Sequence, residues 1–482
     1  MKSLKYFFIG LIFLVSACET NKYLDLYPEN SLSEGVFYKN EDQLVMATND
    51  VYRQLSLLYD AQTIVDYYGE LQSDNAYIYM SSGSAGAYNF IPNFELRPDL
   101  ISWDSYYNGI FICNNIIEIL ENTTVAIEPD LRTRLIAEAT LVRSLFYFNM
   151  VRVWGGVPLI TKKITIEESF TYLREDPDKI YEQIISDLIF AKNNLPETYA
   201  GDDAGRVTRY GAAAILAKIY LTRGDKVAAK NELEFIINSN RFSLDANDDG
   251  TANMDDFRHL FAAKTKNCKE SVLEAQYMSG VNAFNSQHQH AYTPFHTAFH
   301  LPGYTLTRRG EGRLTPTDDI IAEFENGDQR LGATIEMGFI MLSTGEFIDY
   351  PYTNKFFDPD IEYSGQNFEI IRYADILLMY AEITGDATYL NMVRQRAGMP
   401  LFGSSEYPLG LYPTLELAIE HERRVELAFE FHRFFDLVRT GRAIEIMQAK
   451  GYSKINSDRL LWPIPQDAID VNPGLIQNPG YN

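Results

Sequence analysis

The most constraining feature of this sequence is a helix pair over residues 216–237, "LAKIYLTRGDKVAAKNELEFII". Apolar and small residues recur at helical spacing on both sides of Gly224 and Asp225, and this Gly-Asp pair predicts a tight turn. Small Ala side chains let the two helices approach each other, while Leu216 and Tyr220 fill the groove between them. Such a pair buries its remaining apolar face only against neighbouring pairs. The segment therefore predicts a mostly α protein built from stacked helix pairs.

Other segments repeat this pattern less closely. Residues 134–156 predict a long helix that ends at paired glycines, and residues 176–196 predict the returning helix. A third pair spans residues 372–398 around a second Gly-Asp turn. The first segment has the offsets of a tetratricopeptide repeat at Leu216, Ala217, Tyr220, Gly224, Asp225 and Ala229. Together the pairs predict a tetratricopeptide-like α-solenoid.

Two long segments do not fit the helical pattern. Residues 65–100 are rich in Tyr, Ser and Gly, and residues 277–312 combine His with aromatic residues. Long irregular segments are usually functional or disordered, and this aromatic density argues against disorder. The C-terminal tail is also irregular, because its prolines forbid a regular helix and predict an extended strap over the repeats: Pro463, Pro465, Pro473 and Pro479.

The composition limits the possible partners. The chain has 482 residues, 32 Tyr and 29 Phe against only 3 Trp, and a formal charge of -24. Tyr has an apolar ring face and a polar tip, which suits wet binding surfaces. The negative charge repels phosphate backbones, so we expect no nucleic-acid partner.

The N-terminus has the features of a bacterial lipoprotein signal. Lys2 and Lys5 precede an apolar run over residues 6–15, which is shorter than the ~20 residues a membrane-spanning helix needs. The following "VSAC" resembles a lipobox, so we expect residues 1–17 to be a signal peptide and Cys18 to be lipidated. The alternative is an ordinary signal peptide with a coincidental Cys. No later stretch is long and apolar enough to cross a membrane, which predicts a lipid-anchored protein.

Residues 244–257, "LDANDDGTANMDDF", resemble a calcium-binding loop. Calcium prefers six to eight oxygen ligands, and alternate residues of a tight loop can supply them while a glycine permits the sharp turn. The predicted ligands are Asp245, Asn247, Asp249, Thr251, Asn253 and Asp256. A single copy argues against a calcium sensor, so we predict a structural calcium ion; the alternative is a solvated polar turn.

Two clusters of ionisable residues have structural interpretations. Glu422, Glu426 and Glu430 lie at helical spacing and repel one another unless arginines separate them. Arg423, Arg433 and Arg439, with Arg394 or Arg396, predict a structural ion network there. His288, His290, His296 and His300 lack the spacing of a zinc site and are interpreted as hydrogen-bonding or stacking residues.

No motif marks an enzyme. The sequence has no nucleophile elbow, phosphate loop or dinucleotide fingerprint, and we name no catalytic residue. A glycoside hydrolase needs only two suitably spaced carboxylates, so that class stays open. Cys113 and Cys268 are too few for a disulfide framework and are expected to be free, buried thiols.

Several segments resemble the SusD/RagB family of outer-membrane glycan-binding lipoproteins. The tail "LLWPIPQDAIDVNPGLIQNPGYN" is similar to the terminal signature of that family, and "RYADILLMYAEI" and "RRVELAFEFHRFFDLVRTGRA" resemble two preceding helices. The matches run from about Leu24 to Tyr481. The family usually has Gly where this chain has Phe431, and a longer connection between the helices of the 372–398 pair. The resemblance implies one SusD-like domain over residues 18–482, with a helical-repeat part at about 24–240 and a RagB/SusD part at about 270–482.

The resemblance also implies a function. We expect a cell-surface, lipid-anchored outer-membrane protein that binds a glycan and delivers it to a SusC-like TonB-dependent transporter. Peptide or protein binding on the same scaffold is the alternative, and a surface glycoside hydrolase is a third. From the two irregular segments we predict these ligand-binding residues: Asp74, Asn75, Tyr77, Tyr79, Tyr88, Tyr292, Phe295, Tyr304 and Arg308.

Overall fold

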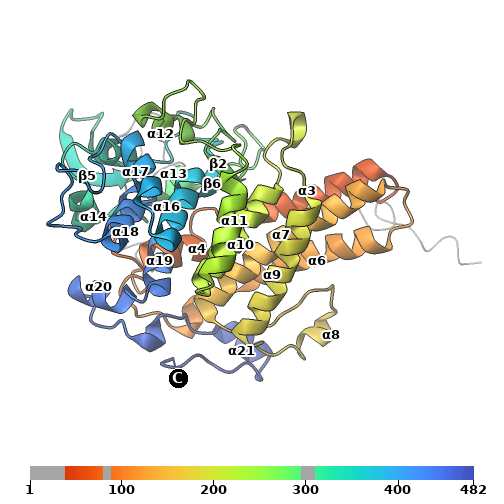
Figure 1. The fold of residues 1–482 in the computed structure, drawn as a ribbon. Helices are drawn as coiled ribbons and strands as arrows, with labels where there is room; N and C mark the ends of the chain where they lie inside the picture. Colours follow the sequence, from red (N-terminus) through yellow and green to blue (C-terminus); the bar gives the residue numbers. More distant parts are fainter. Residues whose placement is uncertain (1–37, 80–87, 295–309, 482) are drawn as a thin grey trace, which may run out of the picture.

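The computed structural model of the protein describes residues 38–79, 88–294 and 310–481. The predicted mostly α fold is confirmed: helices dominate, and the described strands form three two-stranded antiparallel sheets (Figure 1). Cys18 and the predicted signal peptide lie outside the described residues. No helix in the described ranges is long and apolar enough to cross a membrane.

The first half of the chain is a row of long helices. Each packs against the next along the chain, α6 on α7, α7 on α9, α9 on α10 and α10 on α11, while α3 lies against α6 and α7 (Figure 1). Their bounds are α3 Glu41–Leu58, α6 Asp104–Asn122, α7 Pro129–Trp154, α9 Pro177–Asn194, α10 Arg209–Thr222 and α11 Lys226–Ile237.

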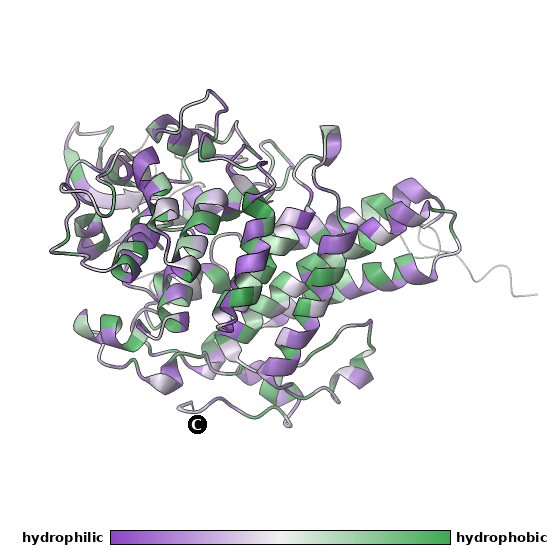
Figure 2. Ribbon diagram, viewed as in Figure 1, coloured by the Kyte–Doolittle hydropathy of each residue, from purple (hydrophilic) through white to green (hydrophobic). Residues whose placement is uncertain are grey.

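The ends of these helices follow the sequence signals. Pro129 begins α7, and Gly155 ends it in a positive-φ conformation (φ 72°) that glycine adopts without strain. Gly224 makes the turn of the α10–α11 pair at φ 77°, and the side chain of Asp225 then caps α11 by accepting from the backbone N–H of Ala228. Hydrophobic and hydrophilic residues alternate along the helices, as stacked amphipathic pairs require (Figure 2). The predicted helix pairs are therefore confirmed.

The second half combines short helices with the three small sheets. Strand β2 pairs with β6, β4 with β5, and β1 with β3. The strands are β1 Ala76–Tyr77, β2 Ser271–Ala275, β3 Thr315–Pro316, β4 Ile335–Ile340, β5 Phe347–Thr353 and β6 Phe368–Arg372. The helices of this half are α12 Met254–Leu260, α13 His288–Tyr292, α14 Asp318–Glu323, α15 Arg330–Thr334, α16 Tyr373–Thr384, α17 Ala387–Arg396, α18 Leu415–Glu426, α19 Arg433–Arg439 and α20 Ala443–Ala449.

The C-terminal tail closes the repeat half, as predicted, but it is not entirely extended. Trp462 donates its backbone N–H to the carbonyl of Val153 at 2.8 Å, and its buried indole packs edge-on against Trp154. A short helix, α21, forms over Gln466–Val471. Pro465 immediately precedes this helix, and the fixed φ of proline is compatible with a helix start. The proline-rich tail therefore contains one helix that the sequence analysis did not predict.

The predicted ion network is present, but only some of the predicted arginines belong to it. Arg394 and Arg396 pair with Glu422 and Glu426, as expected. The other three pair with different carboxylates: Arg423 with Asp375 and Asp436, Arg433 with Asp74, and Arg439 with Glu382.

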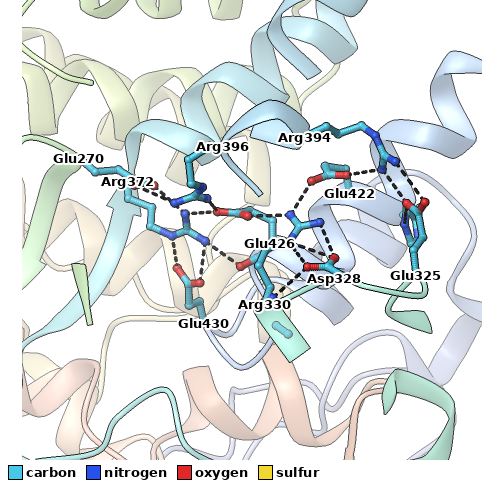
Figure 3. Close-up of polar contacts among 12 residues, drawn as sticks. Glu270, Glu325, Asp328, Arg330, Arg372, Arg394, Arg396, Glu422, Glu426 and Glu430 are labelled. Carbon is cyan, nitrogen blue, oxygen red and sulfur yellow. Dashed lines mark hydrogen bonds and ion pairs between the residues drawn. The ribbon is translucent and has the colours of Figure 1, made fainter. Parts of the chain in front are cut away.

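The network is also larger than expected. Arg372 donates to Glu426 at 2.5 Å and to Glu430 at 2.7 Å, and Arg330 donates to Glu422 at 2.5 Å (Figure 3). All of these side chains are at most 1% exposed. Arg330 and Arg372 were absent from the prediction because they come from α15 and β6, far from α18 in sequence. The network joins α15, α17, α18 and β6 into one body.

Phe431 occupies the position at which the family usually has Gly, and its backbone is left-handed at φ 63°. A non-Gly residue there costs roughly 1–2 kcal/mol. The Phe431 ring stacks on Phe368 with centroids 4.5 Å apart, and burial of both rings offsets that cost. A Cβ at Gly69 would lie 2.3 Å from the Phe431 carbonyl oxygen, so this close approach requires glycine at position 69.

Candidate functional site

The two irregular segments meet in the structure. In the β1–β3 ladder Ala76 is opposite Pro316 and Tyr77 is opposite Thr315. The ladder continues through the Tyr79 N–H, which donates to the Gly312 carbonyl at 3.2 Å. The prediction that segments remote in sequence lie side by side is therefore correct. They form one surface, which we call the aromatic face.

Tyr77 and Tyr79 are the exposed rings of the aromatic face, with 37% and 48% of their surfaces accessible. Tyr79 stacks on the buried ring of Tyr350 in β5, with centroids 4.0 Å apart and planes 28° apart. Because Tyr350 already holds one side of the Tyr79 ring, the other side can bind a ligand with little further loss of side-chain entropy. Such a ring is suited to packing against the apolar C–H face of a sugar.

A polar cluster surrounds Glu311 and Arg313, at the end of the second irregular segment. The Arg313 guanidinium pairs with Glu311, donates to the Tyr67 hydroxyl at 3.2 Å and lies 5.2 Å from the ring centroid of Tyr88. Gln62 donates to the Glu311 carboxylate at 3.1 Å. Arg313 is only 4% exposed and orients Glu311, so the groups that can bind hydroxyls here are the Glu311 carboxylate and the Gln62 amide.

Two predicted ligand-binding residues are structural instead. Asp74 and Asn75 are 2% and 0% exposed. Arg433 donates to both carboxylate oxygens of Asp74, at 2.8 and 3.0 Å. Arg424 donates to the Asn75 side-chain oxygen at 2.9 Å, and Asn75 donates to Glu70 at 2.8 Å. These polar atoms already have hydrogen-bond partners inside the protein, so we correct the prediction for both residues. They hold β1 in place from its buried side.

Tyr292 requires the same correction. It is 1% exposed, and its hydroxyl donates to the Asp66 carboxylate at 2.7 Å. Burial raises the pKa of Asp66 to about 7, although this hydrogen bond and one from the Gln62 N–H act in the opposite direction. Tyr292 is therefore a buried structural residue beneath the aromatic face. Tyr88 is partly buried against Tyr67, with ring centroids 5.2 Å apart, and Phe295, Tyr304 and Arg308 lie outside the described residues.

Four residues of the aromatic face were missed by the sequence analysis: Gln62, Glu311, Arg313 and Tyr350. Glu311 and Arg313 belong to "RRGEGR", directly after the aromatic segment, and their position there was an available signal. Tyr350 comes from β5, and no pattern in the sequence links that strand to Tyr79. Gln62 lies before a π-helical turn at Tyr67–Leu71, a local irregularity often found at functional sites.

The predicted calcium loop folds into a tight, internally bonded turn. Asp245 accepts from the backbone N–H groups of Asp249 and Gly250, at 3.1 and 2.8 Å. The buried Asp256 carboxylate accepts from the N–H groups of Asn247 and Asn253, at 3.0 and 2.8 Å, and Asn253 caps α12. Within the described ranges no group of three or more His, Cys, Asp or Glu side chains is arranged to hold a metal ion. Calcium binding stays a prediction.

The remaining interpretations of the sequence concern single side chains. His288 is buried and packs against both Phe356 and Phe368, with ring centroids 5.0 and 4.9 Å away, as a stacking role requires. His296 and His300 lie outside the described residues. Both cysteines are free, as predicted, but Cys268 is only partly buried.

The fold agrees with comparisons to known proteins. Residues 343–481 match a model described as the SusD family, and residues 22–221 match a model described as starch-binding associating with outer membrane. A SusD-like protein of Formosa agariphila is 28% identical, with 100% of both chains covered. A SusD-like protein of Bacteroides ovatus is 26% identical over 91% of this chain and 82% of the relative. The chain belongs to the SusD family.

Solved structures show the same fold. A laminarin binding SusD-like protein has a TM-score of 0.78 and 27% sequence identity, and the alignment covers 92% of this chain and 100% of that one. Surface glycan-binding protein A from Bacteroides fluxus has a TM-score of 0.75 at 22% identity, with 92% and 100% covered. The predicted SusD-like architecture is thereby confirmed.

Proposed function

We propose that this protein binds a glycan at the cell surface through the aromatic face. The observation that carries the proposal is the Tyr79 ring, half-exposed and supported by Tyr350, beside exposed Tyr77. Sugar rings pack their C–H faces on aromatic planes, while hydroxyls bind to groups such as Glu311 and Gln62. Similar proteins include one named as binding laminarin and others named as surface glycan-binding proteins, which supports this class of ligand.

The proposed role is capture without cleavage. The experiment is a glycan-array screen of the processed protein, followed by incubation of each binding glycan with the protein and measurement of reducing ends. We expect binding of at least one oligosaccharide and no release of reducing ends. Binding of peptides alone would favour the peptide-binding alternative, and release of reducing ends would establish a hydrolase.

We further propose that the protein is anchored to the outer membrane by a lipid on Cys18 and delivers its ligand to a SusC-like TonB-dependent transporter. The lipobox supports the anchor, and the description of the matched family model supports the membrane. Cys18→Ala should leave the protein unprocessed or release it from the membrane, because a lipid is its proposed attachment. The test is fractionation of cells that lack the transporter; a variant that still sediments with outer membranes would contradict the anchor.

A further inference from the structure

A groove of about 490 Å³ lies away from the aromatic face and shares no lining residue with it. Its walls are the loop at residues 197–208, Arg241 and Phe242 after α11, and the segment at residues 265–274 that leads into β2. The volume lies within the ~300–1,000 Å³ typical of small-ligand sites. The groove is therefore large enough to bind a short ligand.

Cationic side chains are prominent in the walls of this groove, although the chain as a whole is acidic. Four cationic side chains line it, and only Glu197 and Glu274 are acidic, in a protein with a formal charge of -24. The cationic residues are Arg206, Arg241, Lys266 and Lys269. The two arginines are neutralised in place, because Arg206 pairs with Glu138 and Asp203, and Arg241 pairs with Glu197. The two lysines are therefore the groups that can attract an anion.

The lysines are the cations most available to a ligand. Lys266 donates to the carbonyl of Tyr277 and makes no ion pair with a carboxylate of the described chain. Lys269 lies 3.6 Å from Asp248, and both side chains are well exposed, at 47% and 71%. An exposed pair of this kind is worth ~0–1 kcal/mol, so a ligand anion can replace Asp248 at little cost.

The acidic Glu274, which also lines the groove, already accepts hydrogen bonds from neutral groups of the protein. The Glu274 carboxylate accepts from the Asn267 N–H at 2.8 Å and from the Asn367 side chain at 2.5 Å. The ring of Phe242, partly buried beside Tyr210, adds an apolar surface to the wall. The groove thus combines two weakly engaged lysines with a ring, which suits a ligand that has both an acidic group and apolar C–H faces.

A second cavity, of about 400 Å³, lies beside α18 and α19 and is lined by arginines. These arginines are not available to a ligand, because carboxylates of the protein already bind them. Arg439 already donates to both oxygens of Glu382, at 2.6 and 2.7 Å, and Arg433 already holds Asp74 at two points. Its guanidinium groups mainly stabilise the fold. We propose that the groove lined by Lys266 and Lys269 is a second ligand site, which binds the acidic group of a short saccharide.

The test is calorimetry on the processed protein with trigalacturonic acid, which carries a carboxylate on each ring, and with the neutral trisaccharide maltotriose. We expect trigalacturonic acid to bind, with an affinity that falls as salt is added, and maltotriose not to bind at this groove. The double variant Lys266→Gln, Lys269→Gln should lose about tenfold or more in affinity for trigalacturonic acid. The matched control Lys162→Gln, Lys163→Gln removes the same charge elsewhere and should bind like the wild type.

Other outcomes would overturn the proposal. They are absence of binding, equal affinity for both trisaccharides, or an equal loss in the two double variants. Displacement by inorganic sulfate at equal affinity would show that the groove takes any anion and not a saccharide. The inference does not depend on the proposed function, because Tyr77→Ala and Tyr79→Ala should leave this binding unchanged. If they abolish it, the trisaccharide binds at the aromatic face and the second site does not exist.

Discussion

Arg433 holds Asp74 at two points, with its Nε 2.8 Å from one carboxylate oxygen and its Nη2 3.0 Å from the other. Both side chains are buried, at 6% and 2% exposure. Asp74 precedes β1, so this ion pair fixes the strand that carries Tyr77. The residue that the sequence analysis assigned to ligand binding therefore positions Tyr77, the ring for which we propose ligand binding, from inside the protein.

Removal of this carboxylate should destabilise the protein strongly. Asp74→Ala leaves buried Arg433 with only the more distant Glu420, 3.8 Å away, as an acidic partner. We expect a loss of about 3–5 kcal/mol in the free energy of unfolding by urea titration at pH 7. The control is Asp99→Ala, which removes an exposed carboxylate paired with Arg97 and should cost about 0–1 kcal/mol. Equal costs for the two variants would contradict the structural role of Asp74.

The same pair predicts a pH dependence. Burial alone would raise the pKa of Asp74, but the charges of Arg433 and Arg424 outweigh it and hold the pKa well below its usual range. A depressed folded-state pKa gives stability that is present above the unfolded pKa of ~3.9 and is lost as pH falls further. The difference between the wild type and Asp74→Asn should therefore shrink below about pH 4.

Asp66 should have the opposite pH dependence. Burial raises its pKa to about 7, so its contribution is favourable below the unfolded pKa of ~3.9 and is lost as pH rises through about 7. We expect Asp66→Asn, which stays neutral, to be more stable than the wild type by roughly 2–4 kcal/mol at pH 9, with little difference at pH 4. Urea titrations across this range are the measurement. A stability difference that is constant with pH would show that Asp66 does not titrate in this window.

Calcium should stabilise the wild-type protein if the loop at residues 245–256 binds it. A ligand specific for the native state adds about 2.7 kcal/mol at a hundredfold excess over its dissociation constant. The measurement is the melting temperature in calcium, in magnesium and in chelator. Asp245→Asn with Asp249→Asn should melt at the same temperature in all three buffers. Equal wild-type melting temperatures with calcium and chelator would eliminate the site.

The sequence predicted the helical half well because the signals there are local. Gly155 and Gly224 end or turn helices by their own backbone preferences, and the prolyl tail lies over the repeats as its composition requires. Each of these features depends on residues that are neighbours in the chain. Periodicity and turn residues were therefore sufficient.

The candidate site was predicted only in part because burial depends on distant residues. Tyr77 and Asp74 lie three residues apart in "DNAY", yet one is exposed and the other is enclosed by Arg433, which is 359 residues away in the chain. The support of Tyr79 by Tyr350 likewise comes from a separate hairpin. Sequence composition indicated which segments form the site, but only the packing distinguishes a stacking ring from a buried polar residue.

The central claim is that the aromatic face binds a glycan, and calorimetry on single variants tests it most directly. With the oligosaccharide selected by the array, Tyr79→Ala and Tyr77→Ala should each lose ~1–2 kcal/mol, about tenfold in affinity, without a change in fold. The matched control is Phe170→Ala, which removes a ring that is 47% exposed outside this face. Unchanged binding in the control with weakened binding in both tyrosine variants is the predicted result. Wild-type affinity in both tyrosine variants would contradict the claim.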